Sequence, residues 1–245
     1  MPLKLGDVVL LDYTLSTKED GRVIETTLED VAREHGLYSE GSRYGPRLVV
    51  LGEGELPSGL EEALMKLDEG AEATIELPPE RAFGVRDPNK IRVLSARELS
   101  ARGIVPRVGS EVEVKGERGV IISVGSGRVI VDFNHPLAGR NIVYNVHVVK
   151  VVKTPEEKIR AFLTRWFRDL EPEAVKVSFQ EGEATVDVPV RLLLTEELPA
   201  RLSKFISDVD KHVKEVARLR LSSLIFERPS PAQEESPATA QAAQT

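Results

Sequence analysis

The sequence predicts an α+β protein in which short antiparallel strands outnumber helices and which contains more than one domain. Short aliphatic and β-branched segments recur between Gly, Pro and Asp turns from residue 5 to residue 152. The chain has 245 residues, which is longer than an average single domain. The balance of charges changes at Asp87-Pro88, which indicates a module of different composition.

The first 87 residues are expected to form strands with two short helices between them. Val8 to Leu15 and Val23 to Thr27 flank an Asp-Gly turn, a pattern typical of a β-hairpin. Apolar residues at helical spacing, followed by Gly70, predict a helix within residues 58–67. The remaining expected elements are a helix at 28–35 and strands at 48–51 and 73–77.

Residues 88–131 differ in charge from the rest of the chain. They carry eight lysines and arginines against four glutamates, a net charge of +4 within a protein whose net charge is −7. A helix is expected at 95–102 and strands at 111–114, 120–124 and 128–133. These residues therefore predict a small β-rich module.

A long strand at 141–152 is predicted to precede a C-terminal α+β domain at residues 154–228. Thr154 with Pro155 and Glu157 forms a helix N-cap signal. A hairpin is expected around Glu181-Gly182, a long amphipathic helix from Leu198 to Val216, and a strand through residues 219–225. The tail at residues 229–245 is rich in Pro, Ala, Gln and Ser and is predicted to be disordered.

Several classes of chemistry lack support in the sequence. There is no cysteine, the four histidines stand far apart, and no glycine-rich phosphate loop is present. We therefore expect no metal and no cofactor. The acidic net charge argues against nucleic-acid binding, and the apolar runs are too short to span a bilayer. Without a secretory signal, a cytoplasmic location is the default expectation.

Four blocks carry a resemblance to a known family. They are Val9–Glu25 with its Lys-Glu-Asp-Gly turn, Leu51–Leu64 (LGEGELPSGLEEAL), Leu77–Gly84 (LPPERAFG), and Asn134–Val146, which begins NHPLAG. In this order and spacing they resemble the FKBP-type peptidyl-prolyl cis-trans isomerases, in particular the SlyD-like subgroup and its long archaeal members. The resemblance implies an FKBP-like antiparallel sheet wrapped on a short helix, formed by residues 1–87 and 132–153.

The same resemblance implies an isomerase site acting on proline-containing polypeptides. Rotation about an X-Pro bond needs no acid or base, because an apolar pocket can favour the twisted amide. The family blocks place five catalytic residues: Tyr13, Glu25, Leu56, Phe83 and Tyr144. They also place Ile24, Val49, Pro57 and Leu60 against the substrate. For each apolar side chain of this site, packing in the core is the competing interpretation.

Two residues depart from the family pattern. Phe83 stands where the family usually has a tyrosine whose hydroxyl binds a substrate carbonyl. Pro57 has no backbone N–H to donate to substrate. Both departures favour a weaker isomerase than the best members of the family. They also leave open an alternative, a holdase chaperone that has the FKBP fold without catalysis.

The resemblance further implies that residues 88–131 are an insert-in-flap domain that holds unfolded polypeptides. Such a surface needs apolar side chains that its own fold leaves uncovered. The candidates are Ile91, Val93, Leu94, Ile104, Val112 and Ile121. For each of them, burial in the core of a small module is the competing interpretation.

The C-terminal domain resembles the extra domain of the long archaeal members, for which an association role is implied. Two alternatives remain open for its amphipathic helix. The helix packs within its own domain, or it pairs with a second copy to form a homodimer.

Overall fold

The computed structural model describes residues 1–168 and 170–223. These residues divide into two compact units, with the division between Val151 and Val152. The tail predicted to be disordered at 229–245 lies outside the described residues. Within the described ranges, no helix is long and apolar enough to span a bilayer, and no cluster of side chains is suited to a metal ion.

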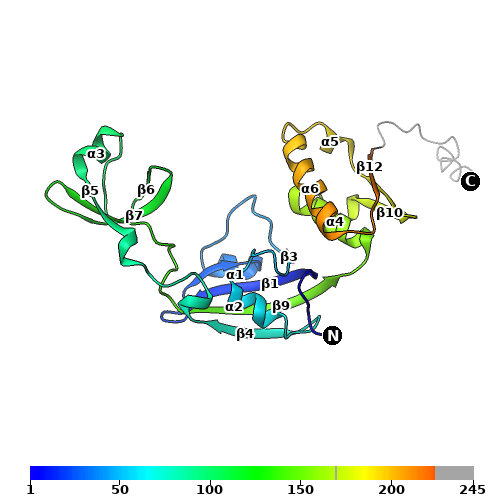
Figure 1. The fold of residues 1–245 in the computed structure, drawn as a ribbon, viewed down its shortest axis with the longest axis horizontal. Coiled ribbons are helices and arrows are strands. Elements are labelled where there is room, and N and C mark those ends of the chain that lie inside the picture. The colour runs from blue at the N-terminus through cyan, green and yellow to red at the C-terminus, as the bar shows by residue number, and fades with distance from the viewer. Residues whose placement is uncertain (169, 224–245) are drawn as a thin grey trace, which may run out of the picture. The chain divides into compact units, whose positions relative to one another are not determined.

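A five-stranded sheet forms the body of the first unit (Figure 1). Its strands are β1 (Val8–Thr17), β2 (Val23–Thr26), β3 (Arg47–Val50), β4 (Glu72–Leu77) and β9 (Ile142–Val152). The order is β2-β1-β9-β4, and β3 pairs with the first half of β1. The α+β class and the antiparallel sheet predicted from the sequence are confirmed.

Strand β1 organises this sheet because it is long enough to pair first with β3 and then with β2, and it also pairs with β9. Val8 lies opposite Val50 in β3, and Thr14 lies opposite Thr26 in β2. Since side chains alternate along a strand, Tyr13 and its neighbours two residues apart point into one core. That core holds sixteen buried side chains.

Helix α2 (Ser58–Leu64) lies against this core and buries Leu60 and Leu64 completely. Burial of each such leucine stabilises the fold by about 1.5–3 kcal/mol. The helix ends at Leu64 rather than at Leu67, because the backbone tightens into a turn in which the Leu67 N–H donates to the Leu64 carbonyl at 2.9 Å. The other short helix of this part is α1 (Glu29–Glu34).

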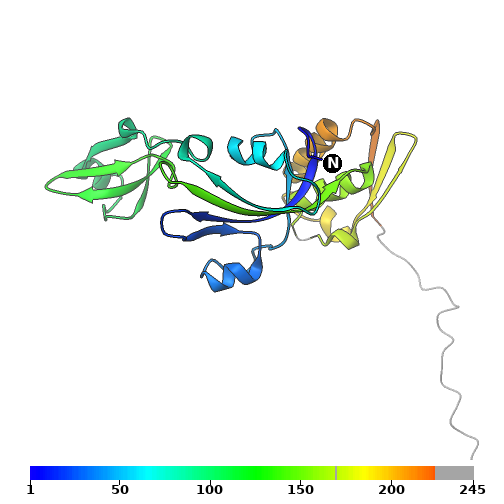
Figure 2. The ribbon, with the colours of Figure 1, turned by 90° about the horizontal axis from the view of Figure 1, so that it is seen from below.

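Residues 88–131, here called the insert, form most of a second sheet, whose strands can be followed in Figures 1 and 2. Its order is β5-β8-β7-β6. The elements are β5 (Ile91–Ser95), α3 (Ala96–Ala101), β6 (Glu111–Val114), β7 (Glu117–Val124) and β8 (Arg128–Asp132). Strand β5 was not predicted, because Val93 and Leu94 are adjacent apolar residues and break the alternation.

Hydrogen bonds tie together the two chain segments that connect the insert to the first sheet. The Asp87 N–H donates to Asn134 Oδ1 and the Asn134 side-chain amide donates to the Asp87 carbonyl, both at 2.9 Å. Arg86 pairs with Asp132. Although partial burial raises the pKa of Asp132, hydrogen bonds from Asn134 and the charge of Arg86 lower the net value. These contacts fix the two chain segments to each other at the point where the insert joins the first sheet.

The second unit contains two long helices and a three-stranded sheet. The helices are α4 (Pro155–Trp166) and α6 (Leu198–His212), and they contact each other. The strands are β10 (Lys176–Gln180), β11 (Glu183–Asp187) and β12 (Arg218–Ser222), in that order. Strand β11 is antiparallel to β10 and parallel to β12.

Local features of the second unit confirm one prediction and correct another. The Thr154 side chain accepts a hydrogen bond from the Glu157 N–H, as the N-cap signal predicted. Helix α6 ends at His212 and not at Val216, because Val213 leaves the helical conformation with φ −126° and ψ 70°. A further short helix, α5 (Val190–Leu193), was not predicted.

Replacement of Gly59 in α2 by alanine should destabilise the first unit. A Cβ atom at this position would lie 2.8 Å from the Arg81 carbonyl oxygen and 2.8 Å from Leu77 Cδ2. The resulting shift of backbone should lower the free energy of unfolding by about 1–3 kcal/mol. Urea unfolding followed by tyrosine fluorescence reports on this unit, because all four tyrosines lie within residues 13–144.

The matched control for Gly59→Ala is Gly125→Ala, because a Cβ at Gly125 meets nothing within 4 Å and no positive φ is required there. It should change the unfolding midpoint little. Equal midpoints for the two variants would contradict the close packing of α2.

Candidate active site

The predicted site residues converge on one side of the first sheet. Tyr13 and Tyr144 are each 3% exposed and come from β1 and β9. Val49 from β3, Leu56 from the loop before α2, and Leu60 from α2 are buried in the same cluster. Ile24 and Phe83 are partly buried and pack against it. Six segments of the chain thus supply one apolar surface, of which Val49 and Leu60, at 0% exposure, form the buried support.

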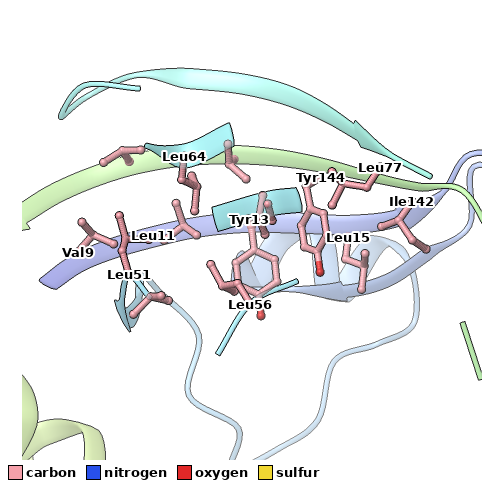
Figure 3. Packing of buried hydrophobic residues seen from close by; sticks show 14 of the residues in the cluster. Val9, Leu11, Tyr13, Leu15, Leu51, Leu56, Leu64, Leu77, Ile142 and Tyr144 are labelled. Carbon is pink, nitrogen blue, oxygen red and sulfur yellow. The ribbon is translucent and has the colours of Figure 1, made fainter. Parts of the chain in front are cut away.

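The two tyrosines form the centre of this surface. Their ring centroids lie 5.9 Å apart and the planes meet at 61°, an edge-to-face contact. Figure 3 shows the rings side by side, with both hydroxyl oxygens on the same side of the sheet. Among the described residues, the Tyr144 hydroxyl has no hydrogen-bond partner, whereas that of Tyr13 has two.

A polar group of three residues borders the apolar surface. The Tyr13 hydroxyl donates to Glu25 Oε1, and Arg47 Nη1 donates to the same hydroxyl at 2.9 Å. Arg47 and Glu25 also form an ion pair at 3.7 Å, and both side chains are about half exposed. The charges of Glu25 and Arg47 balance at the edge of the site.

Arg47 is a site residue that the sequence analysis did not identify. The available signal was a charged side chain at the start of a strand that is otherwise buried. Its position opposite Leu11 in β1 brings it close to Tyr13, which only the strand register reveals. Within this site Arg47 is the cation that compensates Glu25.

Both tyrosine hydroxyls remain protonated at neutral pH. Burial, reinforced by the hydrogen bond and charge of Glu25, raises the pKa of Tyr13 to about 12. Burial also raises the pKa of Tyr144, with a further contribution from the charges of Tyr13 and Glu25. Tyr144 is therefore a neutral hydroxyl that can donate a hydrogen bond.

Phe83 lies on a loop that precedes the insert, and its ring is supported by a residue that follows the insert in the sequence. Its ring stacks on the His135 imidazole with 4.6 Å between centroids and an interplanar angle of 1°. His135 Nδ1 in turn accepts a hydrogen bond from the Leu137 N–H at 3.2 Å. From the sequence, His135 was noted only as one of four histidines that stand far apart, and this stacking was not predicted.

Pro57 begins the turn into α2 and contributes no N–H to the site. Its carbonyl accepts hydrogen bonds from the Leu60 and Glu61 N–H groups at 2.9 and 3.1 Å. The preceding residue, Leu56, is 7% exposed. Pro57 therefore fixes the start of the helix that carries Leu60.

The six predicted contacts on the insert fall into three groups. Val93 is 61% exposed, while Ile91, Leu94 and Ile104 are partly buried. Val112 and Ile121 are buried in the core of the second sheet, at 5% and 0% exposure. Because inward-facing strand positions pack against α3 and neighbouring strands, these two side chains are not available to a client.

Within the described residues, no cluster of side chains at this site is suited to a metal ion. The site presents apolar and aromatic side chains, one unpartnered hydroxyl and a balanced carboxylate–guanidinium pair. Such a surface suits an uncharged, partly apolar ligand with carbonyl groups to bind.

Comparison with known proteins gives matches over both parts of the first unit. The family model for FKBP-type peptidyl-prolyl cis-trans isomerases matches residues 2–96, and a model described as FKBP26, IF domain matches residues 92–137. The short-type peptidyl-prolyl cis-trans isomerase of Methanocaldococcus jannaschii is 35% identical over 155 residues, which is 63% of this chain and 98% of the relative.

Bacterial relatives match the same region. An FKBP-type 16 kDa peptidyl-prolyl cis-trans isomerase of Escherichia coli K12 is 33% identical over 151 residues, covering 60% of this chain and 91% of the relative. The FKBP-type peptidyl-prolyl cis-trans isomerase SlyD of Aeromonas hydrophila is 32% identical over 154 residues, covering 62% of this chain and 66% of the relative.

Removal of the Tyr13 hydroxyl should weaken the first unit measurably. Tyr13→Phe removes one hydrogen bond to Glu25 and one from Arg47, so the free energy of unfolding should fall by about 1 kcal/mol. The control is Tyr44→Phe, because the Tyr44 hydroxyl accepts from the Ser39 N–H in an exposed loop. Urea unfolding of both variants is the measurement, and equal small losses would contradict the structural role of Tyr13.

Proposed function

Because the chain belongs to the family of FKBP-type peptidyl-prolyl cis-trans isomerases, we propose that it isomerises X-Pro bonds at the surface around Tyr13 and Tyr144. We further propose that residues 1–87 and 132–153 form the isomerase domain and that residues 88–131 hold the unfolded client. The observation that carries the first proposal is the convergence of Tyr13, Leu56 and Tyr144 in one apolar cluster bordered by Glu25.

Isomerisation of an X-Pro bond requires of the protein a binding site of suitable shape and polarity. The barrier to rotation about an X-Pro bond is about 20 kcal/mol and arises from amide resonance. A proline ring against Ile24, Phe83 and the exposed edge of Leu56 would remove the amide from water, while Val49 and Leu60, at 0% exposure, support these side chains from within the core. The amide then loses its hydrogen bonds to water, which stabilise the planar form. The twisted transition state, whose resonance is reduced, is therefore favoured relative to the planar ground state.

Tyr144 is proposed as the hydrogen-bond donor to a substrate carbonyl. Phe83 has no hydroxyl for this role, and the Tyr13 hydroxyl already serves Glu25 and Arg47. The Tyr144 hydroxyl has no partner among the described residues, and its raised pKa keeps the proton in place. A donor to a carbonyl next to the rotating X-Pro amide, rather than to the oxygen of that amide, would position the peptide without stabilising the planar form.

Tyr144→Phe should lower kcat/KM for a short X-Pro peptide by about three- to tenfold, the equivalent of one hydrogen bond. Phe83→Tyr should raise it by a similar factor, because it supplies a second donor. A protease-coupled assay measures both, with Tyr38→Phe as the control, because Tyr38 is 40% exposed on a loop outside the site. An unchanged rate for Tyr144→Phe would remove its hydroxyl from the mechanism.

The holding role of the insert is supported by its exposed aliphatic side chains. Val93, Val105 and Val108 are 61%, 70% and 66% exposed. A small module that leaves such side chains uncovered offers apolar contacts to an unfolded chain. The alternative role, a holdase without catalysis, shares this feature but predicts no acceleration of a short X-Pro peptide.

Replacement of residues 88–131 by a short Gly-Ser linker should separate the two roles. Turnover of a short X-Pro peptide should change less than about twofold, because the site residues lie outside the insert. Catalysis of the proline-limited refolding of a whole protein should fall by at least about tenfold, because the client is no longer held. Equal loss in the two assays would refute the division of labour.

The C-terminal domain is proposed to join two copies of the chain. Helix α6 buries Phe205 and Val209 within its own unit, yet Ile206 on the same helix is 48% exposed and Leu194 is 78% exposed. These apolar side chains are the candidate contact between copies.

Light scattering should give the mass of a dimer for the full chain and of a monomer for a chain that ends at residue 153. Ile206→Glu combined with Leu194→Glu should also yield a monomer, because a buried apolar contact does not accept two carboxylates. A monomeric full chain would rule out the dimer.

A further inference from the structure

The insert carries cations that no acidic side chain compensates. Its net charge of +4 leaves −11 on the rest of the chain. Arg92, Arg102 and Arg118 form ion pairs with Glu117, Glu98 and Glu113. Within the described part of the chain, no ion pair involves the three remaining arginines of the insert, which are Arg97, Arg107 and Arg128.

Two of these arginines stand beside exposed aliphatic side chains. Val93 lies opposite Ile130 in the β5–β8 ladder, and Ser95 lies opposite Arg128. Since residues two apart on a strand share a face, Arg128 projects from the same face as Val93 and Ile130. This face lies opposite the one that carries Val129 and Val131 into the core.

The second arginine sits in the loop that follows α3. Arg107 is flanked by Val105 and Val108, which are 70% and 66% exposed. The end of this loop is attached to β7, because the Gly109 N–H donates to the Ile121 carbonyl at 2.8 Å. This loop, which is attached to β7 at its end, therefore exposes two valines and Arg107 close together in the sequence.

We propose that the insert selects unfolded polypeptide segments in which aliphatic residues are flanked by aspartate or glutamate. The inference rests on the proposed holding function and adds the chemical class of the client. Val93 with Arg128, and Val105 and Val108 with Arg107, form two patches of the same chemistry: in each, the valines bind the apolar part of such a segment and the arginine attracts its carboxylates. The remainder of the chain, which is strongly acidic, repels the same carboxylates, so attraction is confined to the insert.

A polypeptide fits this surface better than a single-stranded nucleic acid. Binding of single strands relies on aromatic side chains that stack on the bases, and residues 88–131 contain no Phe, Tyr or Trp. The exposed side chains beside the arginines are aliphatic instead. The arginines and the exposed valines of the insert together favour an acidic, aliphatic stretch of unfolded protein as the ligand.

The test uses the full chain and three fluorescent peptides that share one Val/Leu-rich centre and differ only in flanks of Glu, Gln or Lys. Fluorescence anisotropy in about 50 mM salt should give binding in the order Glu, Gln, Lys, with about a three- to tenfold step from Gln to Glu. The difference should shrink in about 0.5 M salt, while binding of the Gln peptide persists.

Variants locate the effect on the insert. Arg107→Gln combined with Arg128→Gln should abolish the preference for Glu flanks and leave the Gln peptide bound as before. The matched control, Arg102→Gln combined with Arg118→Gln, removes the same charge from paired arginines and should retain most of the preference.

Four results would overturn the inference, and they differ in whether the proposed holding function survives. Equal affinity for the Glu and Gln peptides, or equal loss of preference in the two double variants, refutes charge selection while the holding function survives. Displacement of the Glu peptide by a short RNA at equal concentration points to a nucleic-acid surface instead. Absence of binding by all three peptides refutes the holding function as well.

Discussion

The Tyr13 hydroxyl, shared between Glu25 and Arg47, is the interaction on which the site depends. The ring of Tyr13 is part of the core, yet its hydroxyl ends at a carboxylate and a guanidinium that are half exposed. Because these three residues come from β1, β2 and β3, one hydroxyl ties three strands together. It also keeps the carboxylate of Glu25 at the edge of the apolar surface, where its charge is balanced by Arg47.

The same constraint explains why we propose Tyr144 as the hydrogen-bond donor. A hydroxyl that already makes two hydrogen bonds to charged groups has little to offer a substrate. Phe83, supported by its stacking on His135, supplies only an apolar ring. The proposal thus assigns Tyr13 to holding the strands together and Tyr144, whose hydroxyl has no partner among the described residues, to binding a carbonyl.

The strands of the first unit could be predicted because alternation and turn residues agree with the fold along β1, β2 and β9. Helix ends were less predictable: α6 stops at His212 although apolar spacing continues to Val216, because Val213 turns the chain toward β12. The site residues in β1, β9 and α2 follow from family blocks.

Arg47 and the stacking of His135 on Phe83 depend on strand register and on a contact across the insertion, neither of which is visible in local sequence. For the same reason, local sequence does not separate exposed Val93 from buried Val112 and Ile121.

The most direct test of the proposed site is an amide-resolved NMR titration of the full chain with a short X-Pro peptide that lacks charged flanks. If the peptide binds at the proposed site, the largest shifts occur around Tyr13, Leu56, Phe83 and Tyr144, with small shifts in residues 88–131. Shifts confined to the insert, with none around the two tyrosines, would contradict it.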